Sequence, residues 1–330
     1  MFKGKSYSVV LVIVLIFLAP RLVEIFKSTD KTAIAFYYTW YSDVSCWSNK
    51  VKTLPQPGAN KCSDPNIVKQ HVYWAQMAKI DCFAISYWGW LDDRSKSCLE
   101  VVDVLTEQHF KFCLMLEGDS EDFASVQLAS SELEKIQNQY LNNPNYLKTS
   151  DSKPVIIVFD VPSKVDFWRK IKDLYPDFSF WLSMKQTSVE PSVLSVTDLV
   201  SVFDLIDTYN PFSYGMGLSA FTGLPAEVSV ITGLQTYFTQ KSYWNLQTKY
   251  SSVTICLQFD NTAWADIYHD RVPVAIPYSD NIANTYKNEL NKNYVFVTSW
   301  NEFYENSQCE PSVADGQKLL QALQSLLRNL

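Results

Sequence analysis

Two glutamates near the C-terminus, Glu302 and Glu305, have the type and spacing that point most directly to chemistry. They follow an apolar, β-branched run at residues 295–298, which is typical of a strand buried on both faces. Aromatic residues accompany them at positions 300, 303 and 304. Ionised Glu is rarely buried without partners, and the neighbouring rings need shelter from water. The combination therefore favours the wall of a cleft over open surface.

Paired carboxyl groups at the mouth of a fold are the groups that cleavage of a glycosidic bond requires. One protonates the leaving oxygen, and the other acts as nucleophile or base on the opposite side. Glu302 and Glu305 are therefore the predicted catalytic pair. Because they are three residues apart, the period-2 alternation of a strand cannot place both side chains on one face. We expect the chain to break or bulge near Phe303, with Trp300 packed beneath it.

The elements that must position this pair are short apolar runs that alternate with helical patterns. The last helical pattern, residues 316–330, places five leucines on one face, and an early one starts at the Ser63-Asp64-Pro65 signal. Eight strands alternating with helices predict an α/β fold, a single (β/α)8 barrel over residues 30–330. The expected strands cover residues 32–41, 81–87, 111–116, 154–159, 178–184, 205–209, 253–259 and 295–298.

Active sites of such barrels lie at the C-terminal ends of the strands. The polar and aromatic residues at those ends are therefore the candidate site. The expected substrate contacts are Tyr38, Trp40, Trp88, Glu117, Tyr209, Asn301 and Tyr304. Tyr87, Asp160, Asn210 and Asp260 end other strands on the same face. His71 shares an apolar helix face with Ile67, Trp74 and Ala78 and is expected to be a core histidine.

The bulk composition narrows the class of ligand. A net charge of -7 argues against a nucleic-acid partner, which would need a basic stripe. Aromatic residues make up 15% of the chain, and flat aromatic faces suit carbohydrates. The three histidines show no metal-ligand spacing, and no glycine-rich phosphate loop occurs. We therefore expect no metal and no cofactor.

The N-terminus has the character of a targeting segment. Lys3 and Lys5 precede the apolar run at residues 9–19, and a second apolar patch follows Arg21. The pattern fits both a cleaved signal peptide and an uncleaved signal anchor within residues 1–29. The lysines favour a cytoplasmic N-terminus. We expect a catalytic domain outside the cytoplasm, either secreted or held at the membrane by a single span.

The seven cysteines divide between predicted strands and loops. Cys82, Cys113 and Cys256 fall inside strands and are expected to be buried free thiols. Cys46 and Cys62 flank one loop and are candidates for a disulfide in an exported domain.

Residues 298–311, TSWNEFYENSQCEP, resemble the signature of glycoside hydrolase family 99, the endo-α-mannosidases. Residues 36–41, FYYTWY, are similar to that family's first strand. The resemblance implies a metal-independent, retaining (β/α)8 enzyme. It also implies that Glu302 is a base on the sugar's 2-hydroxyl, which attacks the anomeric carbon to give a 1,2-anhydro sugar. Glu305 would protonate the leaving group and then activate water.

The motif departs from the family pattern at three places. Tyr304 stands where the family has His, Asn306 stands where it has Gly, and residues 260–262 replace an arginine-rich stretch. The expected substrate is an oligosaccharide or polysaccharide of the α-mannoside type, cleaved in the manner of an endo-α-1,2-mannosidase or mannanase. Two other classes stay open: a glycosyltransferase-associated protein of polysaccharide assembly, and a glycan-binding barrel without catalysis.

Overall fold

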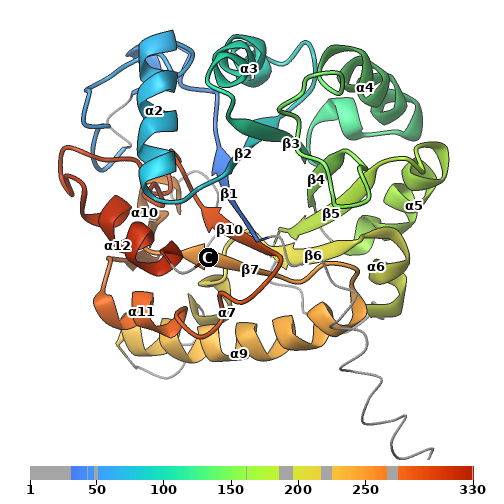
Figure 1. Ribbon diagram of the computed structural model, residues 1–330. Helices are drawn as coiled ribbons and strands as arrows, with labels where there is room; N and C mark the ends of the chain where they lie inside the picture. Colours follow the sequence, from blue (N-terminus) through green and yellow to red (C-terminus); the bar gives the residue numbers. More distant parts are fainter. Residues whose placement is uncertain are drawn as a thin grey trace, which may run out of the picture.

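The computed structural model describes residues 31–42, 44–47, 51–160, 162–185, 196–216, 225–265, 274–328 and 330. Within these ranges eight parallel strands form a nearly closed barrel with helices around its outside (Figure 1). The expected N-terminal targeting segment, residues 1–29, lies outside the described residues. Among the helices that are described, none is both long and apolar enough to cross a bilayer.

The barrel strands are hydrogen-bonded in the order β6-β5-β4-β3-β2-β1-β10-β7. Each overlaps one of the eight predicted strands, which confirms the predicted alternation of strands and helices. The first and seventh strands end three or four residues earlier than predicted. The bounds are β1 Thr32–Tyr37, β2 Cys82–Tyr87, β3 Lys111–Glu117, β4 Val155–Asp160, β5 Ser179–Met184, β6 Leu205–Thr208, β7 Ser252–Cys256 and β10 Tyr294–Thr298.

Helices cover the outer face of the strands. The longer ones are α2 Pro65–Met77, α3 Cys98–Glu107, α4 Val126–Gln139, α5 Val165–Leu174, α6 Val196–Val202, α9 Ala226–Gln247, α11 Asp280–Thr285 and α12 Lys318–Leu327. Short elements in the connections are η1 Val44–Cys46, η2 Asp93–Ser95, η3 Glu121–Phe123, η4 Pro162–Lys164, α7 Ser213–Met216 and α10 Thr262–Ala265. The sequence did not predict the antiparallel pair β8 Phe259–Asp260 and β9 Ala275–Ile276. The predicted start of α2 is confirmed, because the Asp64 carboxylate accepts a hydrogen bond from Asn66 N at 2.8 Å.

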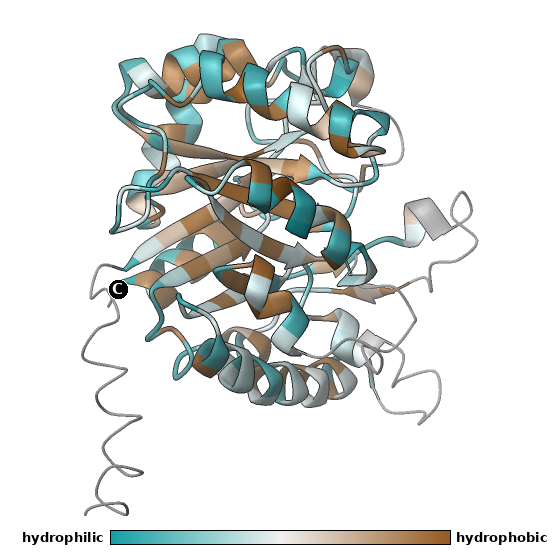
Figure 2. Cartoon of the chain, turned by 90° about the vertical axis from the view of Figure 1, so that its right-hand side faces the viewer, coloured by the Kyte–Doolittle hydropathy of each residue, from teal (hydrophilic) through white to brown (hydrophobic). Residues whose placement is uncertain are grey.

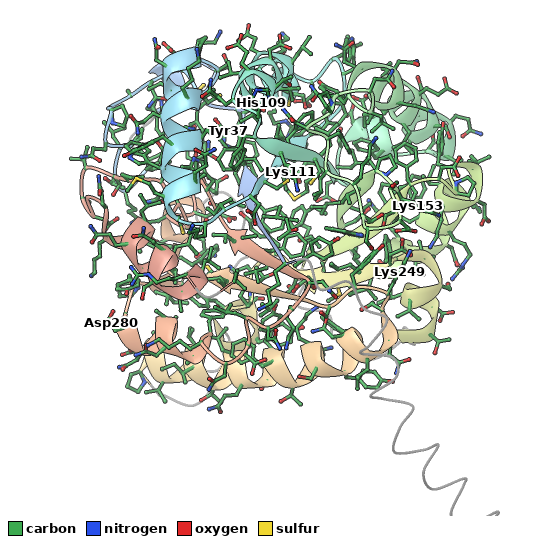
Figure 3. All side chains as sticks on the ribbon, viewed as in Figure 1. Tyr37, His109, Lys111, Lys153, Lys249 and Asp280 are labelled. Atoms are coloured by element: carbon green, nitrogen blue, oxygen red, sulfur yellow. The ribbon has the colours of Figure 1, made fainter. Side chains whose placement is uncertain are left out.

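Alternation along the strands sorts side chains between the barrel interior and the helix layer. The strands are mostly apolar, whereas the helices carry polar residues outward (Figure 2). Side chains fill the space enclosed by the strands (Figure 3). Phe36 stacks on Phe296 of the neighbouring strand with ring centroids 5.6 Å apart, whereas Tyr37, one residue along, reaches His71 of α2.

His71 is the buried core histidine that the sequence predicted, at 1% exposure. Its Nδ1 lies 3.0 Å from the Tyr37 hydroxyl, and its Nε2 lies 3.0 Å from a carboxylate oxygen of Glu310. The three side chains join β1, α2 and the segment after β10.

The barrel's seam lies between β6 and β7, the two ends of the strand order, and α9 fills it. Tyr237 of α9 accepts a hydrogen bond from Thr254 N of β7 and donates one to Asp207 of β6. The ammonium of Lys241, buried at 2% exposure, lies 3.4 Å from the same aspartate and donates to Ser252 of β7. Side chains from one helix thus replace the missing strand-to-strand hydrogen bonds.

The cysteines form no disulfide. All seven are free, so the suggested pairing of Cys46 with Cys62 is wrong. The Cys62 thiol instead donates to the carbonyl of Thr39 at 3.0 Å in the buried base of the loop after β1. Cys82, Cys113 and Cys256 are buried free thiols, as expected.

Candidate active site

The segment after β10 presents the two glutamates on a turn. β10 ends at Thr298, four residues before Glu302, and residues 303–306 form the turn. One oxygen of Glu302 accepts hydrogen bonds from Tyr304 N at 2.8 Å and from the Tyr41 hydroxyl at 3.2 Å. The predicted break near Phe303 is confirmed. The carboxylate caps the turn that carries Glu305, which fixes the two groups relative to each other.

Asn306 explains how the turn forms without the glycine that family 99 has at this place. Its φ is +48°, in the left-handed region where Asn, after Gly, is among the best tolerated residues. Asn306 therefore adopts a left-handed conformation that favours glycine.

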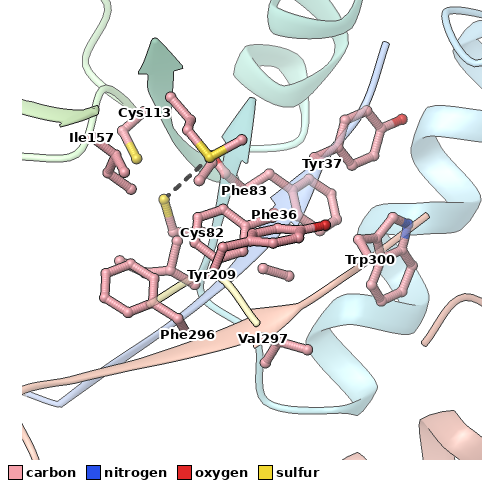
Figure 4. Packing of buried hydrophobic residues seen from close by; sticks show 14 of the residues in the cluster. Phe36, Tyr37, Cys82, Phe83, Cys113, Ile157, Tyr209, Phe296, Val297 and Trp300 are labelled. Carbon is pink, nitrogen blue, oxygen red and sulfur yellow. Dashed lines mark hydrogen bonds between the residues drawn. The ribbon is translucent and has the colours of Figure 1, made fainter. Parts of the chain in front are cut away.

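Trp300 is fully buried, as expected for a ring packed beneath the break. Its ring packs against Phe83 of β2 and His71 of α2, with centroids 5.3 and 5.8 Å apart. Figure 4 shows it set apart from the rings of Phe36, Tyr209 and Phe296. Trp300 lies two residues past the end of β10 at Thr298.

Asn301 braces the two segments that form the site. Its amide accepts from Tyr38 N at 2.8 Å and donates to Tyr38 O at 2.9 Å, and the side chain is buried. Rather than reaching outward as a substrate contact, it ties the β10 turn to the end of β1. It thereby positions both Tyr38 and the glutamates.

The two glutamates differ in their surroundings. Glu302 is 3% exposed, and Glu305 is half-buried. Burial raises the pKa of Glu302 well above its usual value, and the negative charge of Glu305 raises it further. The hydrogen bonds from Tyr304 N, the Tyr41 hydroxyl and Glu305 N act in the opposite direction. The charge of Glu305 therefore influences the protonation of Glu302.

Tyr38 and Tyr209 bridge the barrel mouth beside this pair. The Tyr38 hydroxyl donates to the Tyr209 hydroxyl at 2.7 Å, linking the end of β1 to the end of β6. Burial is the main cause that raises the pKa of each phenol, and nearby carboxylates add to it. The negative charges of Glu117 and Glu302 raise the pKa of Tyr38. Those of Glu305 and Glu302 raise the pKa of Tyr209. Tyr38 and Tyr209 therefore lie within electrostatic reach of the three glutamates.

Glu117, at the end of β3, is a third carboxyl group in the mouth. It is 4% exposed and accepts a hydrogen bond from the Ser86 hydroxyl at 2.6 Å. Burial raises its pKa to about 8, more than the Ser86 hydrogen bond lowers it. At neutral pH this group is therefore largely a neutral acid, able to donate a hydrogen bond.

The two predicted tryptophans line the same end of the barrel. Trp40 stacks on Tyr38, with centroids 4.4 Å apart. Trp88 donates from Nε1 to the Ser86 hydroxyl at 3.2 Å, and the guanidinium of Arg94 covers one face of its ring at 3.4 Å. Both rings are partly exposed, which leaves surface for a ligand.

Other residues at the strand ends serve the scaffold. Tyr304 stacks on Tyr41, with centroids 5.3 Å apart, and its hydroxyl donates to Cys46 O, so it faces the loop after β1. Tyr87 donates to Glu132 of α4 at 2.7 Å. Asp160 is fully buried against Trp168 and Lys164. Asp260 and Asn210 accept backbone hydrogen bonds from Thr262 and Phe212.

Two residues at the site escaped the sequence analysis: Tyr41 and Ser86. The Tyr41 hydroxyl donates to Glu302 and also accepts from Phe303 N at 2.9 Å. Ser86 links Glu117 to Trp88. Tyr41 lies past the end of β1, so strand parity could not place it. Ser86 was identifiable in principle, because it lies two residues before Trp88 on a buried strand.

The described residues hold no group of three His, Cys, Asp or Glu side chains arranged to bind a metal ion. What the site offers is acid-base chemistry, with three carboxyl groups framed by aromatic rings.

Solved structures with a similar fold include glycoside hydrolases. The family 99 endo-α-mannosidase from Bacteroides thetaiotaomicron superposes with a TM-score of 0.69 at 18% identity, over 92% of this chain and 98% of that chain. A second structure of that enzyme gives a TM-score of 0.68, also at 18% identity and the same coverage. A glycoside hydrolase-like protein gives 0.64 at 14% identity, over 91% and 94% of the two chains.

At these identities the likeness shows the fold, and it agrees with the resemblance seen in the sequence motif. No model of a known protein family matches the chain, and no curated protein matches it.

Proposed function

We propose that this protein is a retaining glycoside hydrolase that cleaves α-mannoside-type glycans internally, like the endo-α-mannosidases it resembles in fold. The observation that carries the proposal is the turn after β10. It holds Glu302 and Glu305 together at the barrel mouth, beside Tyr38 and Tyr209. The motif resemblance and the family 99 fold neighbours support the substrate class.

Glu302 acts as the base. Tyr304 N and the Tyr41 hydroxyl both donate to Oε1, which orients the carboxylate for a proton of the substrate. A raised pKa makes a carboxylate a stronger base, and burial raises the pKa of Glu302. In the proposed route Glu302 withdraws the proton of the 2-hydroxyl, whose oxygen attacks the anomeric carbon. The leaving oxygen departs with a proton from Glu305, and a water activated by Glu305 then opens the 1,2-anhydro sugar.

Binding of the glycan must move a proton within the pair. In the ligand-free protein, burial favours the neutral form of Glu302, whereas the proposed route needs an ionised Glu302 and a neutral Glu305. Glu305 is half-buried, so a bound sugar removes more water from it than from Glu302. Loss of water favours the neutral form of a carboxyl group. Loss of water on binding therefore favours the protonated acid that the proposed route requires.

The test compares Glu302→Gln and Glu305→Gln on two substrates that share the glycan and differ in the leaving group. Glu305→Gln should lose most turnover of the natural glycan and retain turnover of an aryl glycoside with an activated leaving group, which needs no protonation. Glu302→Gln should slow both. A 2-deoxy analogue should not be cleaved.

Each contrary outcome has a separate meaning. Normal activity of Glu302→Gln, or turnover of the 2-deoxy analogue, would refute the participation of the 2-hydroxyl. If the activated leaving group restored the turnover of Glu302→Gln and not that of Glu305→Gln, Glu302 would be the acid and Glu305 the base. If the wild-type protein bound mannose glycans and did not cleave them, it would be a glycan-binding barrel without catalytic activity. Polymer synthesis from a nucleotide sugar would indicate a role in polysaccharide assembly.

The proposal includes a location. The lysines and apolar residues of the N-terminal sequence support an exported catalytic domain, anchored or secreted. Cell fractionation tests this, because recovery of the intact chain in the cytosol would contradict it.

A further inference from the structure

The end of the barrel opposite the active site is rich in lysine. Six of the eight barrel strands have a lysine at their first residue or within the three residues before it. These are Lys31, Lys79, Lys111, Lys153, Lys249 and Lys292. Figure 3 labels Lys111, Lys153 and Lys249 around the barrel. We call this surface the basic face and define it as the helix-to-strand connections, the first residues of the strands, and Arg328.

The basic face has the opposite charge from the whole molecule. Its described residues include nine basic and five acidic side chains, a net charge of +4, whereas the whole chain has a net charge of -7. Lys249 pairs with Asp151, and Lys292 lies 3.8 Å from Glu289. Lys79, Lys111 and Lys148 are exposed, and no carboxylate of the described residues lies within 4 Å of their ammonium groups. Lys79 and Lys111 act electrostatically on Asp81 without an ion pair to it, and all three ammonium groups are exposed to a partner.

Apolar side chains are exposed near the same end. Met77, Leu174 and Leu246 stand at the C-terminal ends of α2, α5 and α9, with exposures of 37%, 59% and 69%. In a barrel of this kind the C-terminal ends of the helices lie at the same end as the starts of the strands. Lysines interspersed with exposed leucines are typical of surfaces that lie on anionic lipids.

A cavity of about 280 Å³ opens near the start of β1. Its polar lining residues are Lys31, Lys287, Asn291 and Ser325. Its apolar lining residues are Leu290, Leu326 and Leu330. The lining contains two ammonium groups, and such cations suit the phosphate of an anionic headgroup. The mostly apolar sequence at residues 9–26 ends five residues before Lys31.

From this placement we infer that the basic face rests on an anionic lipid surface, so that the barrel mouth opens away from the membrane. A strand of five or six residues is roughly 17–20 Å long. The glutamates, at the other end of the strands, would lie at about this distance from the lipid surface. The inference goes beyond the proposed hydrolysis. A protein without hydrolytic activity would give the same result in the test below.

The test uses the full chain in lipid nanodiscs of phosphatidylcholine, with and without phosphatidylglycerol, and measures labelling of lysine amines by mass spectrometry. Labelling of Lys79, Lys111 and Lys148 should fall about tenfold in the anionic discs and recover at high salt, because lipid headgroups cover these amines electrostatically. Lys61 and Lys96 sit in the connections at the mouth end, so their labelling should not change.

Charge reversal supplies the matched variants. Lys111→Glu/Lys287→Glu should abolish the protection of Lys79 and Lys148, whereas Lys61→Glu/Lys96→Glu, with the same change in net charge, should keep it. Circular dichroism checks that both variants fold.

The inference is overturned by unchanged labelling in anionic discs, or by an equal fall at Lys96. Protection by polyglutamate but not by discs would also overturn it and indicate an acidic protein partner.

Discussion

Glu302 combines a structural role with a proposed catalytic one. Its carboxylate caps the turn after β10, and it is also the proposed base. Tyr304 N and Tyr41 hold one oxygen in place. A side chain that is already fixed loses little entropy when it acts, which is the benefit of a preorganised site. Its pKa is then set by burial and by Glu305.

The pH profile reports on this arrangement. In the proposed mechanism Glu302 acts as a base only when it is ionised, so kcat/KM should fall as the pH drops through its raised pKa. In Glu305→Gln the negative neighbour is lost, which removes one cause of the raised pKa, and the acid limb should shift to lower pH. The measurement is kcat/KM against pH with an activated aryl glycoside. An acid limb that stays in place would show that the limb does not report Glu302.

Tyr41→Phe should affect both function and stability. The variant loses a hydrogen bond that favours the ionised form of Glu302, so the acid limb should shift to higher pH. It also leaves Phe303 N without its acceptor, at a cost of about 1–3 kcal/mol. pH-rate profiles and urea unfolding measure the two effects. Tyr304→Phe is the matched control, because its hydroxyl contacts Cys46 O and not the carboxylate. Equal shifts in both variants would contradict the assignment to Tyr41.

At the scale of elements, the seam between β6 and β7 depends on α9. Lys241 and Asp207 are both about 2% exposed, so each charge needs the other. Tyr237 adds hydrogen bonds to both strands. A helix here completes the hydrogen bonding of a barrel whose last strand pair has no ladder of its own.

Lys241→Met should destabilise the barrel by about 3–5 kcal/mol, because it leaves the Asp207 carboxylate buried without its cation. The double variant Lys241→Met/Asp207→Asn should recover a large part of this loss, since both charges are then gone. Chemical unfolding of the wild type, the two single variants and the double variant gives the coupling energy. Additive losses would mean that the two side chains do not interact across the seam.

On the scale of the whole molecule, the stability of the barrel does not depend on disulfides. All seven cysteines are free, and six of them are buried. Burial raises the pKa of Cys98 to about 11 and that of Cys309 to about 12, so little reactive thiolate exists at neutral pH.

Two measurements follow from the free thiols. A reducing agent should leave the Tm unchanged, and a thiol reagent should modify the half-buried Cys46 first, with the others reacting only on unfolding. A lower Tm under reducing conditions would show that a disulfide forms in the mature protein.

The sequence by itself determined the barrel, because apolar runs that alternate with amphipathic helices can bury their surfaces in few other ways. It also predicted the glutamate pair as the catalytic groups, since carboxylates next to sheltered aromatics have no good packing explanation. The resemblance in residues 298–311 added the enzyme family to consider, and the fold neighbours agree with it.

Only the tertiary structure showed which candidate side chains bond to other parts of the protein. Asn301, Tyr304 and Asp160 match the pattern of site residues, yet their polar groups are engaged by Tyr38, Cys46 and Trp168. Tyr41 reaches Glu302 although 261 residues separate them in the chain. Strand periodicity assigns a side chain to a face only while the strand continues, and the site is built where the strands have ended. There, hydrogen bonds between distant segments set the direction of each side chain, and no local pattern in the sequence records those bonds.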